Sequence, residues 1–205
     1  MKTLRVCSIL ALAVLVAGVL GTTASAQNFA WTAHGAKTPL LTNSAPDVQK
    51  VNYFSNANTS GAPDGKVRIT NPGSPTGNIC AQIYVFDPLQ ELTECCACLV
   101  TPNGLRKLSV NNDLTANPLT GVKLTDGEVT IISGYTNNNV CNPLNDIVSP
   151  TIRAWGTHVD DSFLITETEY SERSLGLWND NLLVDCYAIQ LDGSGHGSCS
   201  CGTGD

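Results

Sequence analysis

The chain has 205 residues, with 11 Lys and Arg against 18 Asp and Glu and a net charge of -7. An acidic chain without a basic run argues against nucleic acid and against anionic membrane surfaces as partners. The acidic residues are spread thinly along the sequence, so their simplest role is to keep the protein soluble.

The first 26 residues have the three parts of a secretory signal peptide. Lys2 and Arg5 make a positive start, residues 6–20 are almost wholly apolar, and Ala24-Ser25-Ala26 is a cleavage site of the A-x-A type. The apolar run is shorter than the roughly 20 residues of a transmembrane helix. We therefore expect residues 1–26 to be removed, the mature chain to be exported, and no membrane insertion after signal cleavage.

Residues 27–48 are rich in small and polar residues and are predicted to be an N-terminal extension. Within it, Phe29, Trp31 and Ala33 alternate with other residues, which indicates a short strand. Two outcomes stay open for this strand. Residues 28–33 can pair with an open sheet edge of a neighbouring subunit, or the extension can pack on its own domain.

Residues 49–170 alternate short strand patterns with turn signals, which predicts one β domain. The expected strands include KVNYF, KVRIT, ICAQIYVF, EVTIISGY, TIRAWGTHV and FLITETEY. ICAQIYVF is apolar on both faces, as in a central strand that is covered on both sides. Because no regular helix separates these strands, we predict a mainly β fold, an antiparallel β-sandwich of immunoglobulin-like or jelly-roll-like type.

Two segments of this domain contain more specific local signals. Asp87, Pro88 and Gln90 have the spacing of a helix N-terminus and predict one or two helical turns before the next cysteines. The sequence LVTPNGLRKLSV predicts a hairpin that turns at Pro102-Asn103-Gly104.

Residues 171–205 change to a helical period and are predicted to pack on the same domain. Apolar residues recur at helical spacing: Leu175, Trp178, Leu182, Cys186 and Ile189. Gly193 is suited to a C-terminal cap, although a strand over LLVDCYAIQL competes with the helix. We expect a C-terminal amphipathic helix followed by a disulfide-fastened Gly/Ser tail.

Eight cysteines remain after the signal peptide, and they are expected to form disulfides of unknown pairing: Cys80, Cys95, Cys96, Cys98, Cys141, Cys186, Cys199 and Cys201. Exported proteins meet oxidising conditions, and the number of cysteines is even. Cys95 and Cys96 should each reach a different distant partner, because a bridge between chain neighbours strains the disulfide.

A metal site is the main alternative to disulfides. Cys186, His196, Cys199 and Cys201 are candidate zinc or copper(I) ligands and would make this a periplasmic metal-binding or thiol protein. Their spacing differs from the paired C-x2-4-C of structural zinc sites. We therefore predict no metal and no other cofactor.

Redox chemistry is a weaker alternative. Cys95 and Cys98 have the C-x-x-C spacing of a thiol redox centre, but Cys96 intervenes. Glu91 and Glu94 would also disfavour the thiolate that such chemistry needs.

His158 and Asp160 lie two apart on a predicted strand, so their side chains share one face. With Asp161 they are suited to orient a base or hold a cation, which keeps a secreted hydrolase as a second alternative. No G-x-S-x-G or H-E-x-x-H motif accompanies them, and a strand that enters an Asp-Asp-Ser turn explains them equally well. We predict no catalytic residue.

The run VRITNPG, the core YVFD…ECCxC…PNGL and the tail GSGHGSCSCG resemble a group of uncharacterised exported bacterial proteins. The resemblance covers roughly residues 66–205. It implies export and a shared fold, and it brings no activity, cofactor or site residue.

These features together predict a non-enzymatic structural or adhesion-type module at the cell surface, in the matrix or in filaments. Its expected partners are other proteins or further copies of itself. Export leaves it extracellular, on the cell surface or in the periplasm.

Overall fold

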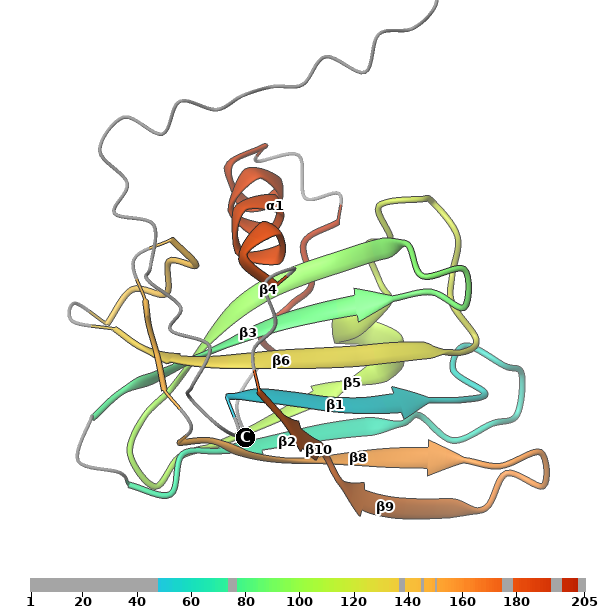
Figure 1. Cartoon of the computed structure of the whole chain (residues 1–205). Helices are drawn as coiled ribbons and strands as arrows, with labels where there is room; N and C mark the ends of the chain where they lie inside the picture. The colour runs from blue at the N-terminus through green and yellow to red at the C-terminus, as the bar shows by residue number, and fades with distance from the viewer. Residues whose placement is uncertain are drawn as a thin grey trace, which may run out of the picture. The chain divides into compact units, whose positions relative to one another are not determined.

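The computed structural model describes residues 48–73, 77–136, 139–144, 146–149, 151–174, 179–192 and 197–202. Its strands form two antiparallel sheets (Figure 1). The first sheet has the order β10-β1-β6-β3-β4, with β7 paired to β6, and the second has the order β5-β2-β8-β9. The strands are β1 (Gln49–Phe54), β2 (Lys66–Thr70), β3 (Ile79–Phe86), β4 (Leu92–Val100), β5 (Leu105–Ser109), β6 (Gly127–Tyr135), β7 (Ile147–Val148), β8 (Arg153–Val159), β9 (Ile165–Glu169) and β10 (Ser171–Arg173). The predicted antiparallel β-sandwich is confirmed.

β3 is the central strand that its sequence predicts. It pairs with β4 on one side and with β6 on the other. Its side chains alternate between two apolar clusters: Ile79, Ala81, Ile83 and Val85 belong to the main core, and Tyr84 belongs to a second cluster under the helix. Both faces of β3 are therefore covered, which explains its continuous apolar run.

The helix α1 (Asn179–Asp192) covers the outer face of the first sheet over β3 and β4 (Figure 1). Leu183 and Cys186 are buried in the second cluster, against Tyr84 and Cys95. The predicted helix with Cys186 on its apolar side is confirmed, and the competing strand is wrong.

The start of the C-terminal segment differs from the prediction. Ser171–Arg173 forms strand β10, which pairs with β1, instead of opening the helix. Tyr170 is buried at the corner between β9 and β10, where its N–H donates to the Ala154 carbonyl. Leu175 and Trp178 lie outside the described residues.

The helical turns predicted at Asp87 are absent from this described segment, which is the turn of the β3–β4 hairpin. The Asp87 carboxylate accepts hydrogen bonds from the N–H groups of Leu89 and Glu91, at 2.9 and 2.8 Å. Gln90 has a φ of 70°, which ends any helix there. An aspartate before proline caps a turn with the same atoms that would cap a helix, so the capping signal did not distinguish the two.

The turn at Pro102-Asn103-Gly104 is present, with the Gly104 N–H donating to the Thr101 carbonyl at 2.8 Å. It does not form a hairpin, because β4 pairs with β3 and β5 pairs with β2. The connection instead carries the chain from one sheet to the other. A turn sequence fixes the local reversal but not the strands that pair beyond it.

The predictions for the signal peptide and for a strand at residues 28–33 lie outside the described residues. Within the part of the chain that the structure describes, no helix is long and apolar enough to cross a membrane.

Candidate functional site

The cysteine cluster of β4 is divided between two faces of the strand. Successive residues of a strand point to opposite faces, so Cys96 and Cys98 share one face and Cys95 takes the other. Cys95 points toward α1, while Cys96 and Cys98 face the main core. The disulfides are Cys80–Cys141, Cys95–Cys186, Cys96–Cys199 and Cys98–Cys201. The neighbours Cys95 and Cys96 thus reach different distant partners, as expected.

The C-terminal tail lies along the outer edge of β4 and is held by backbone hydrogen bonds as well as disulfides. The Cys95 N–H donates to the Gly197 carbonyl at 2.8 Å, and the Cys199 N–H donates to the Cys95 carbonyl at 3.1 Å. The Ser200 N–H donates to the Asp113 carbonyl at 2.9 Å. This edge of the first sheet is therefore closed by the chain itself.

The candidate metal ligands do not assemble as free donors. Cys186, Cys199 and Cys201 each form a disulfide with a residue of β4. His196 lies outside the described residues. A metal site would need thiolates, and a sulfur in a disulfide supplies none. The same holds for the C-x-x-C pair, since Cys95 and Cys98 are bonded to different partners.

His158 and Asp160 do not form a catalytic pair. His158 is the sixth residue of β8, and its Nε2 lies 2.5 Å from the Thr168 Oγ1. The Asp160 carboxylate instead caps the β8–β9 turn by accepting from the N–H groups of Ser162 and Leu164, at 2.8 and 2.9 Å. Asp161 is exposed in the same turn. The turn explanation for these aspartates is therefore correct.

A groove of about 490 Å³ lies between β1, β9 and β10 and has His158 in its lining. Its other lining residues are Val51, Asn52, Tyr53, Glu128, Thr166, Thr168, Glu169, Ser171 and Arg173. The Tyr53 and His158 rings lie 4.1 Å apart between centroids, and Tyr53 is 60% exposed. Burial lowers the pKa of His158, so its imidazole is neutral at neutral pH. The groove offers hydrogen-bonding groups beside an aromatic ring, with no thiol nucleophile in its lining.

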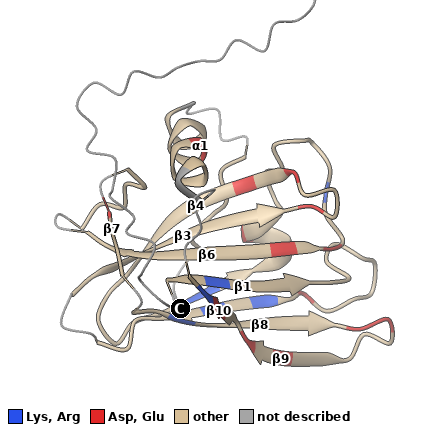
Figure 2. Cartoon of the chain, viewed as in Figure 1, with Lys and Arg blue, Asp and Glu red and all other residues tan. Residues whose placement is uncertain are grey.

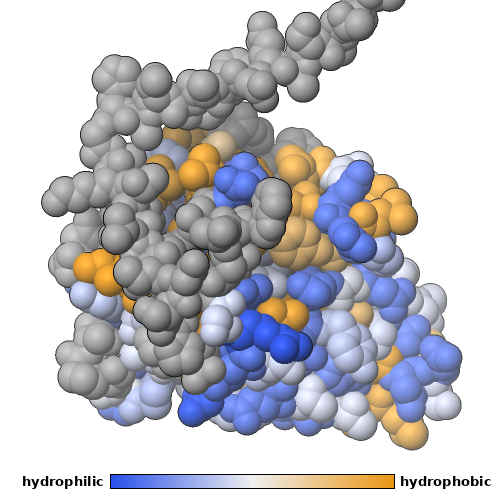
Figure 3. All heavy atoms as spheres, viewed as in Figure 1, coloured by the Kyte–Doolittle hydropathy of each residue, from blue (hydrophilic) through white to orange (hydrophobic). Residues whose placement is uncertain are grey.

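Beside the groove, the β8–β9 turn and β9 are exposed, while most of β8 is buried. Every residue of β9 is exposed, and no described strand pairs with its outer edge. Apolar side chains gather at the tip, where Phe163, Leu164 and Ile165 are 38%, 65% and 56% exposed. Figure 3 shows apolar atoms in this region, and Figure 2 shows acidic residues at the same turn. Sequence reasoning predicted the strand but not its exposure.

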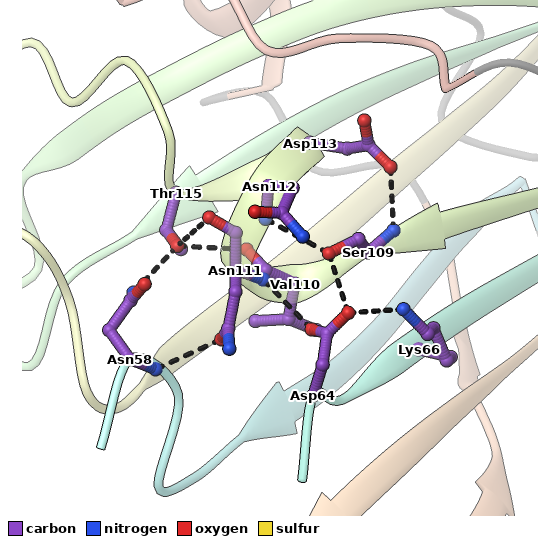
Figure 4. Close-up of polar contacts among 9 residues, drawn as sticks. All are labelled: Asn58, Asp64, Lys66, Ser109, Val110, Asn111, Asn112, Asp113 and Thr115. Carbon is purple, nitrogen blue, oxygen red and sulfur yellow. Dashed lines mark hydrogen bonds and ion pairs between the residues drawn. The ribbon is translucent and has the colours of Figure 1, made fainter. Parts of the chain in front are cut away.

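A second polar cluster surrounds a π-helix, η1 (Val110–Leu114), that the sequence did not indicate (Figure 4). The Asp64 carboxylate accepts hydrogen bonds from Lys66, the Ser109 hydroxyl and the Asn111 N–H. The Asn58 side chain donates to Thr115 at 2.9 Å. These groups bond one another, so the cluster fixes a loop rather than presenting free donors to a ligand.

Comparisons with known proteins give little further information. No family model matches the chain, and no curated protein matches it. One similar solved structure is described as "Anabaena sensory rhodopsin transducer". It is 11% identical, with a TM-score of 0.32, and the match covers 58% of this chain and 94% of that one. A likeness at this level carries no functional information.

Proposed function

We propose that this protein is an exported, non-enzymatic interaction module whose docking surface is the β8–β9 hairpin. One observation supports this most directly: the β4 edge is closed by a disulfide-fastened tail, while among the described residues no strand pairs with the outer edge of β9, which is exposed and has an apolar tip. Exposed sheet edges are sites where another chain can add a strand. Export agrees with the signal peptide pattern and with four disulfides, which persist in oxidising compartments.

The partners in this proposal are other proteins or further copies of the chain at a cell surface, in a matrix or in filaments. Exposed apolar residues that lie together are typical of protein contact sites, whereas single exposed apolar residues are common on any protein surface. Leu164 and Ile165 adjoin one another on the hairpin, whereas Leu89 and Val122 are similarly exposed but lie on separate loops.

The test compares exported protein recovered from producing cells. Wild type is expected in surface-bound or assembled material, and the variant Leu164→Ser/Ile165→Ser is expected in the medium as single chains. The matched control Leu89→Ser/Val122→Ser removes apolar side chains that are at least as exposed but lie elsewhere, and it should behave as wild type. Wild type that is free in the medium as single chains at every concentration contradicts the proposal.

A further inference from the structure

We infer that the outer edge of β9 receives residues 28–33 of a second copy of this chain as an added antiparallel or parallel strand. This inference rests on the proposed function and names the partner of the same surface. It joins three observations: which backbone groups of β9 point away from β8, which charges surround them, and how long the chain is before residue 48.

The hydrogen bonds of the hairpin show which backbone groups point outward. The Asp160 N–H donates to the Leu164 carbonyl, and the Tyr170 N–H donates to the Ala154 carbonyl. Residues of an antiparallel strand bond alternately toward one neighbour and away from it. Even-numbered residues of β9 therefore bond toward β8, and Ile165, Glu167 and Glu169 direct their N–H and C=O groups to the outer edge. These three residues form a regular template for another strand.

The charges on this edge argue against a symmetrical pairing of β9 with β9 of a second copy. An antiparallel pair centred on Glu167 would place that glutamate opposite itself, and like charges directly opposite each other are destabilising. In the free chain, Glu167 bonds Arg68, and Glu169 lies 3.7 Å from Arg153. The edge thus favours a partner strand without acidic residues.

The N-terminal extension has that composition. Residues 27–46 contain no Asp or Glu, and they include His34 and Lys37. Residues 28–33 also alternate apolar side chains at Phe29, Trp31 and Ala33, as a strand with one buried face requires. On β9, Thr166 and Thr168 face the groove that contains Tyr53. An added strand would extend that face and cover the groove with its aromatic side chains.

The length of the extension permits exchange between copies. Val48 is buried where the chain enters the first sheet. The linker from residue 34 to residue 47 can span about 45–50 Å when extended, at about 3.3–3.6 Å per residue. A donor segment and a separate acceptor edge on every copy make a head-to-tail contact, which builds rings or open chains of subunits.

The experiment uses oxidised mature chain and two variants that each lose one half of the contact. Deletion of residues 28–33 removes the donor strand. Glu167→Pro removes an outward N–H from the acceptor edge, where a proline is tolerated because that N–H does not bond β8. Glu167→Gln is the matched control, since it loses the same Arg68 ion pair but keeps the N–H. Light scattering after size separation gives the mass at several concentrations.

Wild type and Glu167→Gln are expected to form species of several chains whose mass rises with concentration. Each of the two other variants should remain a single chain, and an equimolar mixture of them should form a two-chain complex, because one supplies the donor and the other the acceptor. Assembly by the deletion variant alone, or no complex in the mixture, overturns the inference while the proposed function stands. Single chains of wild type with slow amide exchange at Ile165 and Glu167 show that the extension pairs with its own β9, which also overturns it.

Discussion

The disulfide Cys98–Cys201 is expected to contribute less to stability than Cys80–Cys141, although it joins residues 103 apart rather than 61 apart. A bridge stabilises mainly through the loop that it closes in the unfolded chain. While Cys96–Cys199 is intact, Cys98–Cys201 closes a loop of only about six residues, namely residues 96–98 and 199–201.

The chain-entropy relation gives the size of the difference. A loop of about six residues corresponds to about 2 kcal/mol, and one of about 60 residues to about 4 kcal/mol. When both tail bridges are removed, Cys95–Cys186 is the nearest remaining disulfide. Relative to it, the first tail bridge closes a loop of about 15 residues and the second a loop of about six, so the two together contribute about 5 kcal/mol. The two tail bridges are therefore partly redundant.

Urea unfolding of the oxidised proteins measures these losses as differences in the free energy of unfolding. The variants are Cys98→Ala/Cys201→Ala, Cys96→Ala/Cys199→Ala, the combination of both, and Cys80→Ala/Cys141→Ala. Equal slopes with urea concentration are required for the comparison. If loss of Cys98–Cys201 alone is as costly as loss of Cys80–Cys141, then loop closure does not set the contribution of these bridges.

Three further predictions concern single residues. Burial raises the pKa of Glu94 to about 8, so the folded state holds this proton more tightly than the unfolded chain does. The free energy of unfolding therefore falls as the pH rises from about 4.5 to about 8. Urea titrations across this range should show a smaller fall for Glu94→Gln. Burial raises the pKa of Asp64, but hydrogen bonds from Lys66, Ser109 and Asn111 have the larger combined effect and hold this pKa below its ordinary value. Asp64→Asn should therefore cost about 1–3 kcal/mol at neutral pH and less in acid, as urea unfolding at both pH values would show. A Cβ at Gly127 would lie 2.4 Å from the Phe86 carbonyl oxygen, so Gly127→Ala should lower the free energy of unfolding by about 1–3 kcal/mol and the melting temperature with it.

The sequence contained a signal for the tail pairing that the prediction did not use. Cys96 and Cys98 form a C-x-C pair, and so do Cys199 and Cys201. Two parallel segments side by side place such pairs opposite each other residue by residue. Cys95 and Ser198 form a parallel β-bridge of backbone hydrogen bonds in this register. The capping pattern at Asp87 predicted helical turns before the cysteines, so strand β4 (Leu92–Val100) was not predicted and the alternation of its cysteines between two faces was not used.

The exposure of β9 could not be predicted from its own residues. FLITETEY was correctly predicted to be a strand from its composition and from the turn signal before it. Its burial depends on what covers it, and the first sheet ends at β10, which is only Ser171–Arg173. Residues distant in sequence decide whether an alternating strand lies in a core or at a free edge.

The contrast between the two edges follows from what each segment can bury. Residues 197–202 are Gly-Ser-Cys-Ser-Cys-Gly and have little apolar surface apart from the cysteines themselves. Hydrogen bonds along an edge contribute only about 0.5–1.5 kcal/mol each, so a chain end of this composition gains little from pairing alone. Cys199 and Cys201 supply the missing stability covalently and bring their sulfurs into the core. At β9 no described bridge fastens a partner, and a strand that docks there must bring its own apolar side chains, which is why an aromatic segment such as residues 28–33 suits that edge.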